Sequence, residues 1–99
     1  MVAFSVFSLE SYGMILQFGK HRWELAVVPN LKNDGDCDAP DVPNKKIRVD
    51  SSLRGRALLE TYIHEFLHAA CWPLSDDAVE QAGHDISRAL WKLRYRGEK

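Results

Sequence analysis

The sequence predicts one α+β domain, in which a small antiparallel or mixed sheet is followed by a hairpin of two helices. Its 99 residues fit a single domain, so residues 1–99 are expected to share one core. The first half alternates short apolar stretches with turn residues, as strands do. The second half repeats apolar residues at helical spacing and is interrupted at Pro73.

The first two strands are expected to form a β-hairpin. Residues 12–18 and 23–28 are rich in apolar side chains, and the segment Gly19-Lys20-His21-Arg22 separates them. A short connection that contains glycine is typical of hairpins. Pro29 ends the second strand. Residues 1–9 fit a strand or a helix equally well.

The rest of the first half is predicted to be a loop and one further strand. Residues 30–45 contain one glycine, two prolines and four aspartates, which favour turns and irregular backbone. Residues 46–50 then alternate polar and apolar side chains, which predicts a half-exposed strand.

Two amphipathic helices are predicted for the second half. Ser75 is a good N-cap for the second helix, whose first turn holds Asp76 and Asp77, as the helix dipole favours. Between residues 59 and 71 the apolar side chains fall on one arc of a helical wheel, formed by Leu59, Tyr62, Ile63, Phe66, Leu67 and Ala70. The apolar set of the second helix is Val79, Ala82, Ile86, Ala89, Leu90 and Leu93.

The first of these helices carries the most informative motif, because His64-Glu65-Phe66-Leu67-His68 matches the pattern H-E-x-x-H. Two histidines four residues apart share a helix face, here opposite the apolar arc, so both can bind one Zn²⁺. Glu65 points to the side of that face, where it can accept a proton from a water on the metal. His64 and His68 are therefore predicted zinc ligands, and Glu65 is the predicted general base.

A catalytic zinc site needs a third protein ligand, and the predicted hairpin restricts the choice. With a turn near residue 74, His68 is expected to lie level with Glu80, and His64 level with His84. Glu80 and His84 share one face of the second helix. We therefore predict Glu80 as the third ligand and His84 as a partner that orients a ligand histidine. The reverse assignment, with His84 as the third zinc ligand, stays open.

The pattern His64-Glu65-x-x-His68 followed by Glu80 resembles the gluzincins, the thermolysin-type zinc peptidases with two histidine ligands and one glutamate ligand. The chain as a whole is also similar to short H-E-x-x-H proteins of tailed phages and bacteria. The resemblance implies zinc on these three residues and Glu65 as the base. It also implies an extended substrate paired with a neighbouring strand, here the strand of Ile47, Arg48 and Val49. Gluzincins have an acidic or polar residue four positions after the ligand glutamate, where this chain has His84.

Other residues are candidates for subsidiary roles at such a site. Cys37, in the acidic loop, is an alternative fourth ligand that would close the site. Asp76 and Asp77 fit helix capping better than metal binding. Trp91, on the same helix stripe as Glu80, is a candidate wall of the cleft. The candidate donors to the oxyanion formed during hydrolysis are Tyr95, His84 and Arg48.

Charge and composition disfavour several other classes of protein. Thirteen Lys and Arg against fourteen Asp and Glu give a net charge of −1, whereas a duplex nucleic-acid binder needs a basic face. No apolar run approaches the ~20 residues of a membrane span. The N-terminus lacks the basic region and cleavage site of a signal peptide. Two cysteines, Cys37 and Cys71, make no disulfide framework, so a cytoplasmic location with reduced thiols is expected.

The sequence thus predicts a zinc-dependent metalloendopeptidase-like hydrolase that acts on a peptide or protein substrate. The alternative is a zinc-stabilised binding or interaction module without turnover. A chain of 99 residues has little wall with which to enclose a substrate, which favours the alternative. An open coordination position would favour the enzyme, and a fourth protein ligand would favour the structural site.

Overall fold

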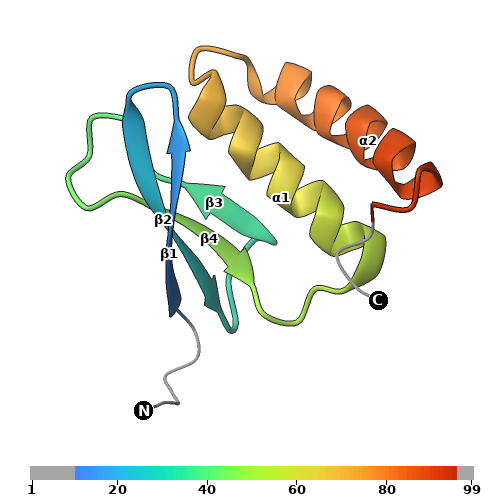
Figure 1. Cartoon of the computed structure of the whole chain (residues 1–99), viewed down its shortest axis with the longest axis horizontal. Coiled ribbons are helices and arrows are strands. Elements are labelled where there is room, and N and C mark those ends of the chain that lie inside the picture. The colour runs from blue at the N-terminus through green and yellow to red at the C-terminus, as the bar shows by residue number, and fades with distance from the viewer. Residues whose placement is uncertain (1–10, 96–99) are drawn as a thin grey trace.

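The computed structural model describes residues 11–95 as four strands and two helices (Figure 1). The strands are β1 (Ser11–Phe18), β2 (His21–Val28), β3 (Gly35–Cys37) and β4 (Lys46–Asp50), and the helices are α1 (Gly55–Ala70) and α2 (Asp76–Lys92). The predicted α+β class is confirmed. The sheet is mixed, because β2 and β4 are parallel and the other neighbours are antiparallel. Residues 1–9, for which two structures stayed open, lie outside the described residues.

The sheet has the strand order β1-β2-β4-β3, and β3 is the element that the sequence did not predict. It lies within residues 30–45, which were expected to form a loop. Glycine and aspartate are depleted in strands, so the segment has no strand signal of its own. Its pairing with β4 defines it, with Gly35 opposite Val49 and Cys37 opposite Ile47.

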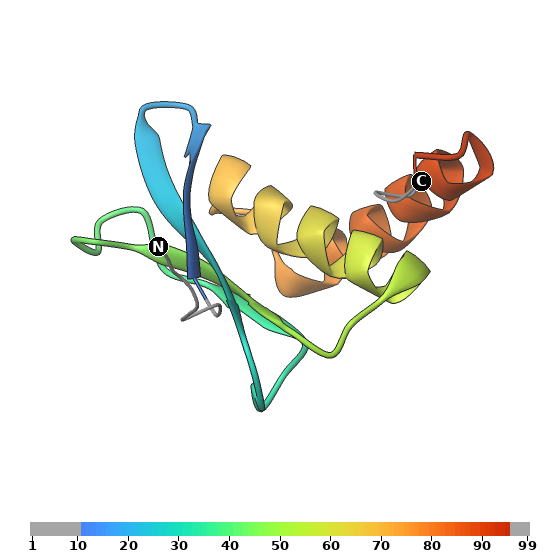
Figure 2. The ribbon, with the colours of Figure 1, turned by 60° about the horizontal axis from the view of Figure 1, so that its bottom comes forward.

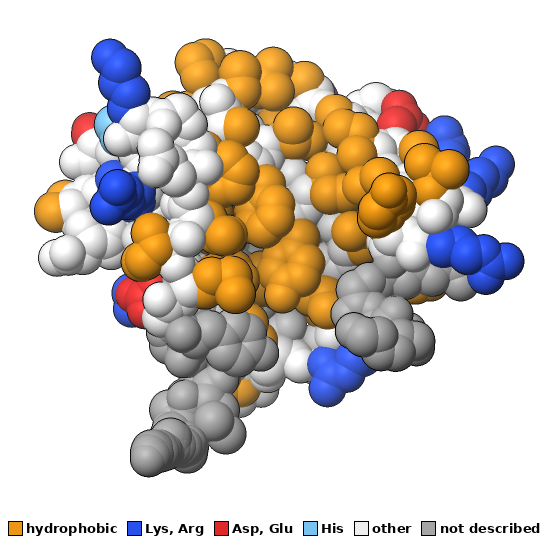
Figure 3. Space-filling model, viewed as in Figure 1, with side chains coloured by type: hydrophobic (Ala, Val, Ile, Leu, Met, Phe, Trp, Pro, Cys, Tyr) orange, Lys and Arg blue, Asp and Glu red, His pale blue; other side chains and the backbone are white. Residues whose placement is uncertain are grey.

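Both helices lie on one side of the sheet, and α1 lies between the sheet and α2 (Figures 1 and 2). The core forms where α1 covers the sheet, and its buried members are Trp23, Leu25, Ile47, Val49 and Ala69. The alternation predicted for β4 is confirmed, because Ile47 and Val49 are fully buried and their neighbours are not. Figure 3 shows the hydrophobic side chains that gather between the β1–β2 hairpin and the helices.

The interpretation of β4 as the substrate-pairing strand is wrong. Its two edges are already occupied, by β2 on one side and by β3 on the other. A strand in this position has no free backbone donors or acceptors with which to pair a peptide. Ile47 and Val49 belong to the core. Among the described strands, the edges of the sheet are formed by β1 and β3.

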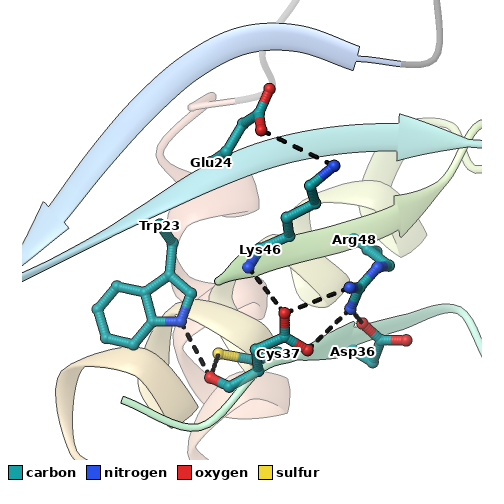
Figure 4. A network of polar contacts seen from close by, with 7 residues as sticks. Trp23, Glu24, Asp36, Cys37, Lys46 and Arg48 are labelled. Carbon is teal, nitrogen blue, oxygen red and sulfur yellow. Dashed lines mark hydrogen bonds and ion pairs between the residues drawn. The ribbon is translucent and has the colours of Figure 1, made fainter. Parts of the chain in front are cut away.

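A network of polar contacts holds the edge strand β3 against β4 (Figure 4). Arg48 Nη1 donates hydrogen bonds to Asp36 Oδ1 at 2.8 Å and to Asp38 Oδ1 at 3.0 Å. Asp38 Oδ2 also accepts from the backbone N–H of Lys46 at 2.9 Å. Burial opposes the charge of Asp38, yet these hydrogen bonds from Arg48 and Lys46 hold its pKa below the usual value. Arg48 is thus a structural partner of β3, and its charge is already compensated there.

The predicted second helix is confirmed, with the N-cap in the expected place. Ser75 Oγ accepts a hydrogen bond from the N–H of Ala78 at 3.1 Å, and Asp76 and Asp77 occupy the first turn. The first helix starts at Gly55, before the apolar arc, and ends at Ala70. Within residues 11–95, neither helix has both the length and the apolar character needed to cross a membrane.

Candidate metal centre

The two motif histidines lie side by side on α1. The rings of His64 and His68 have their centroids 4.9 Å apart and their planes at 68°. Both side chains are half-buried, as expected for the helix face next to a partner helix. Burial, followed by the charge of His64, lowers the pKa of His68 against the opposing effect of Asp76. The neutral imidazole, which is the metal-binding form, is therefore favoured at His68.

Glu65 is buried where α1 packs against the edge strand β3. The sequence did not predict this burial. The residue is 5% exposed, although it lies on the same helix as the half-exposed histidines. Within residues 11–95 it forms no hydrogen bond or ion pair, and its side chain lines two cavities. Burial, followed by the charge of Asp36, raises the pKa of Glu65 to about 7. Its carboxyl oxygens are not among the fully buried unpaired atoms of the described residues, so they open onto the cavity and can meet water or a ligand there.

The motif lines a groove that runs along α1 between β3 and α2. One cavity, of about 370 Å³, is lined by Asn33, Asp34, Gly35, Ala57, Glu60, Thr61, His64, Glu65 and Glu80. A second, of about 440 Å³, is lined by Gly35, Asp36, Cys37, His64, Glu65, His68, Trp72, Asp76 and Glu80. The two cavities share Gly35, His64, Glu65 and Glu80 and together form what we call the site groove. Glu65, both motif histidines and Glu80 thus line one continuous space.

The two helices face each other close to the predicted register, but their side chains meet different partners. A Cβ at Gly83 would lie 3.5 Å from the Cα of His64, so the backbones lie level there, as the position of His84 implied. The side chain of His68, however, faces Asp76, with Nε2 and Oδ1 3.9 Å apart, and not Glu80. The residue numbers predict which backbone positions of the two helices lie opposite each other. A side chain, however, can contact a partner one helical turn, about 5.4 Å, further along the axis.

His84 makes its contact with Glu60. Its Nδ1 lies 3.6 Å from Glu60 Oε2, and the two residues line a separate shallow cavity together with Glu80. The expected contact between His84 and a motif histidine is therefore replaced by a contact with Glu60. The sequence explained Asp76 by its place in the first turn of α2. The structure also places its carboxylate beside His68. The spacing Asp76–Glu80–His84, with four residues at each step, was the signal for this shared face.

Other predicted residues divide between the site groove and the rest of the fold. Cys37 lines the groove, and burial, followed by the charge of Glu65, raises the pKa of its thiol to about 12. Trp72 also lines it, with its ring 6.1 Å from that of His68. Trp91 and Tyr95 do not line either cavity of the groove. Trp91 lies instead near Gly55, at the other end of the hairpin.

The donors in the groove fit Zn²⁺ by their chemistry. Two neighbouring imidazoles and the carboxylate of Glu80 form the nitrogen and oxygen set that zinc prefers. Within the described residues, no three His, Cys, Asp or Glu side chains already converge on a single point. Zinc binding to His64, His68 and Glu80 therefore requires rotation of their side chains, for which the open groove leaves room.

Gly35 is expected to be essential for the packing that places Glu65. A Cβ at this position would lie 2.8 Å from the Arg48 carbonyl oxygen and 2.9 Å from Thr61 Cγ2. Both neighbours belong to packed elements, so Gly35→Ala is expected to destabilise the chain by about 1–3 kcal/mol. Gly83→Ala is the matched control, since its Cβ would make ordinary contacts at 3.5 Å and alanine favours the helix. Urea unfolding measures both, and equal stabilities would contradict the tight approach of β3 to α1.

Comparison with protein-family models, with curated proteins and with solved structures gives no match for this chain.

Proposed function

We propose that this protein is a zinc-dependent peptidase. The observation that carries the proposal is the position of Glu65, which is buried without a partner among the described residues and lines the same groove as His64 and His68. The Glu65 carboxyl oxygens are not among the fully buried unpaired atoms of residues 11–95, so they open onto the groove and no protein group compensates their charge there. The place of Glu65 is explained if a metal and a water occupy the groove beside it.

The ligands in this proposal are His64, His68 and Glu80. Glu80 supports the set because it is exposed, has no ion-pair partner in residues 11–95 and lines both cavities with His64. Asp76, 3.9 Å from His68, is the competing carboxylate. When bound, zinc would supply a Lewis acid that polarises the peptide carbonyl and acidifies water. A site with three protein ligands leaves a position open for such chemistry.

Glu65 would act as the proton carrier of the reaction. It would accept a proton from the water that attacks the peptide carbonyl and return it to the amine that leaves when the C–N bond breaks. The overall reaction adds one water across the peptide bond and needs no other reactant. The packing of the Glu65 side chain against Gly35 of β3 restricts where its carboxyl group can lie along the groove.

The outer edge of β3, which pairs with no other strand among residues 11–95, is suited to hold the peptide. Asp34 O accepts from Asp50 N at 2.8 Å and Asp38 N donates to Lys46 O at 3.0 Å, so alternate residues of this segment turn their backbone groups toward β4. In an antiparallel pair, the residues between them turn their backbone groups to the opposite side. These are Gly35 and Cys37, which line the groove. An extended peptide that adds to this edge would lie beside the motif.

A structural zinc site is the second candidate, and Cys37 is the observation that favours it. Its side chain lines the same cavity as both motif histidines. Thiolate is a strong zinc ligand, and a fourth protein ligand would remove the position that water needs. The protein would then bind partners without hydrolysis, as a small module stabilised by its metal.

The proposal is tested by metal removal and restoration. The zinc-loaded chain is expected to cleave at least one member of a set of unstructured peptides that includes basic, neutral and acidic sequences. It should lose this activity when the metal is chelated and regain it when Zn²⁺ is returned. Mass spectrometry of the products identifies new termini. A chain that holds one zinc but leaves every peptide of the set intact would contradict the peptidase and favour the structural site.

A further inference from the structure

We propose that the site groove selects basic peptides, with lysine or arginine side chains on either side of the cleaved bond. This inference rests on the proposed peptidase function and names its substrate class. Six carboxylates line the groove, and none of the Lys and Arg residues within residues 11–95 does. The carboxylates are Asp34, Asp36, Glu60, Glu65, Asp76 and Glu80.

The acidity of the groove is a local property. The chain as a whole carries a net charge of −1, so its charges are nearly balanced. The face drawn in Figure 3 shows a hydrophobic patch with basic side chains around it, and few acidic side chains. Six of the fourteen Asp and Glu residues of the chain line the one groove. Carboxylates gathered in this way attract cationic ligands and repel anionic ones.

Three of the six carboxylates remain free to meet a substrate. Arg48 neutralises Asp36, and the proposed reaction uses Glu65 and Glu80. In the described part of the chain, no Lys or Arg forms an ion pair with the other three, Asp34, Glu60 and Asp76. Glu60 faces His84 at 3.6 Å and Asp76 faces His68 at 3.9 Å, so in residues 11–95 these three groups supply negative charge that no permanently charged cation compensates.

The free carboxylates stand on both sides of the metal ligands. Asp34 directly precedes β3, and Glu60 lies one helical turn before His64, so the two face the same cavity from different elements. Asp76 lies at the start of α2 beside His68, at the other end of the motif. A peptide along β3 would pass Asp34 and Glu60 on one side of the reaction centre and Asp76 on the other.

A second observation shows that the groove is built to receive positive charge. Glu65 is 5% exposed, has no hydrogen-bond or ion-pair partner in residues 11–95, and lines both cavities. A carboxylate that lacks a protein partner and opens onto a groove is stabilised when a cation approaches it. Zinc held by His64, His68 and Glu80 would supply one such positive charge. The exposed carboxylates at the two ends of the groove extend the same preference along the peptide.

The test measures peptide binding separately from cleavage. The zinc-loaded Glu65→Gln chain, which keeps the groove and lacks the base, is titrated with a fluorescent peptide of alternating alanine and lysine. The same peptide with acetylated lysines is the neutral control, and one of alternating alanine and glutamate is the acidic control. We expect the lysine peptide to bind roughly tenfold more tightly than the neutral one, and added salt to reduce the difference. Equal affinities for the lysine and acetyl-lysine peptides would overturn the inference.

Charge variants of the groove locate the effect. Combining Asp34→Asn with Glu60→Gln is expected to weaken binding of the lysine peptide roughly fivefold and to leave the neutral peptide unaffected. Asp34→Asn alone, at an exposed position, serves if the double variant is unstable. Asp41→Asn makes the same change at an exposed residue outside the groove and should have no effect. A double variant that binds the lysine peptide like its parent would contradict the assignment.

The two proposals fail in different ways. If the lysine peptide binds with the expected preference but the chain with Glu65 intact does not cleave it, the charge selection holds and the peptidase proposal is wrong. If that chain cleaves neutral and basic peptides with equal kcat/KM, the peptidase proposal holds and the selection of basic substrates is wrong.

Discussion

Replacing Glu65 by glutamine is expected to lower peptide hydrolysis by about 10² or more while the fold and the bound zinc are retained. Glutamine keeps the size of the side chain but cannot accept the proton of the attacking water. Glu65 is buried, and a neutral side chain of the same shape avoids the free-energy cost of burying a charge. The variant is therefore expected to fold, so that a lower rate reports the loss of the base. Single-turnover cleavage, zinc content and the unfolding midpoint are measured on the same preparation.

Glu24→Gln is the matched control for this variant. It makes the same chemical change on β2, at a residue that lines neither cavity of the site groove. Its hydrolysis rate is expected to equal that of the parent chain. If Glu65→Gln cleaves as fast as Glu24→Gln, then Glu65 is not the base and the mechanism proposed above is wrong.

The second large effect is expected on metal binding. The parent chain should hold about one zinc per molecule, and His64→Ala or His68→Ala should abolish stoichiometric binding, because each removes one of two neighbouring imidazoles. His21→Ala removes an exposed histidine outside the groove and should keep the zinc. Elemental analysis after dialysis gives the stoichiometry. If both motif variants keep their zinc, the metal site on α1 is excluded.

The same titration ranks the remaining ligand candidates. In competition with a chelator, Glu80→Gln should weaken zinc binding most. Asp76→Asn and His84→Ala should cost at most the roughly 10–100-fold typical of residues that only orient a ligand. A larger loss for Asp76→Asn would transfer the third ligand to the carboxylate beside His68. A comparable loss for Cys37→Ser would indicate a fourth protein ligand and hence the structural site.

The contribution of the sequence is clearest for the regular elements and the motif. Helical periodicity places α1 and α2, and Ser75 marks the start of the second helix, because caps and amphipathic spacing are local properties. Alternation likewise predicts β4. The spacing of His64 and His68 is enough to place their rings side by side, since it follows from the pitch of one helix.

Tertiary structure alone decided which residues surround that motif. The residues of β3 carry no strand signal, and the strand exists because β4 and the side chain of Arg48 hold it in place. Its position makes β3, and not β4, the edge strand on this side of the sheet among residues 11–95, and its Gly35 packs against Glu65. The sequence also left open which side chains make contact across the helical hairpin, such as His68 with Asp76. Residue numbers predict which backbone positions lie opposite each other, but not toward which turn of the other helix a side chain points. Local chemistry therefore determined the ligands that one helix carries, whereas long-range packing determined the groove in which they lie.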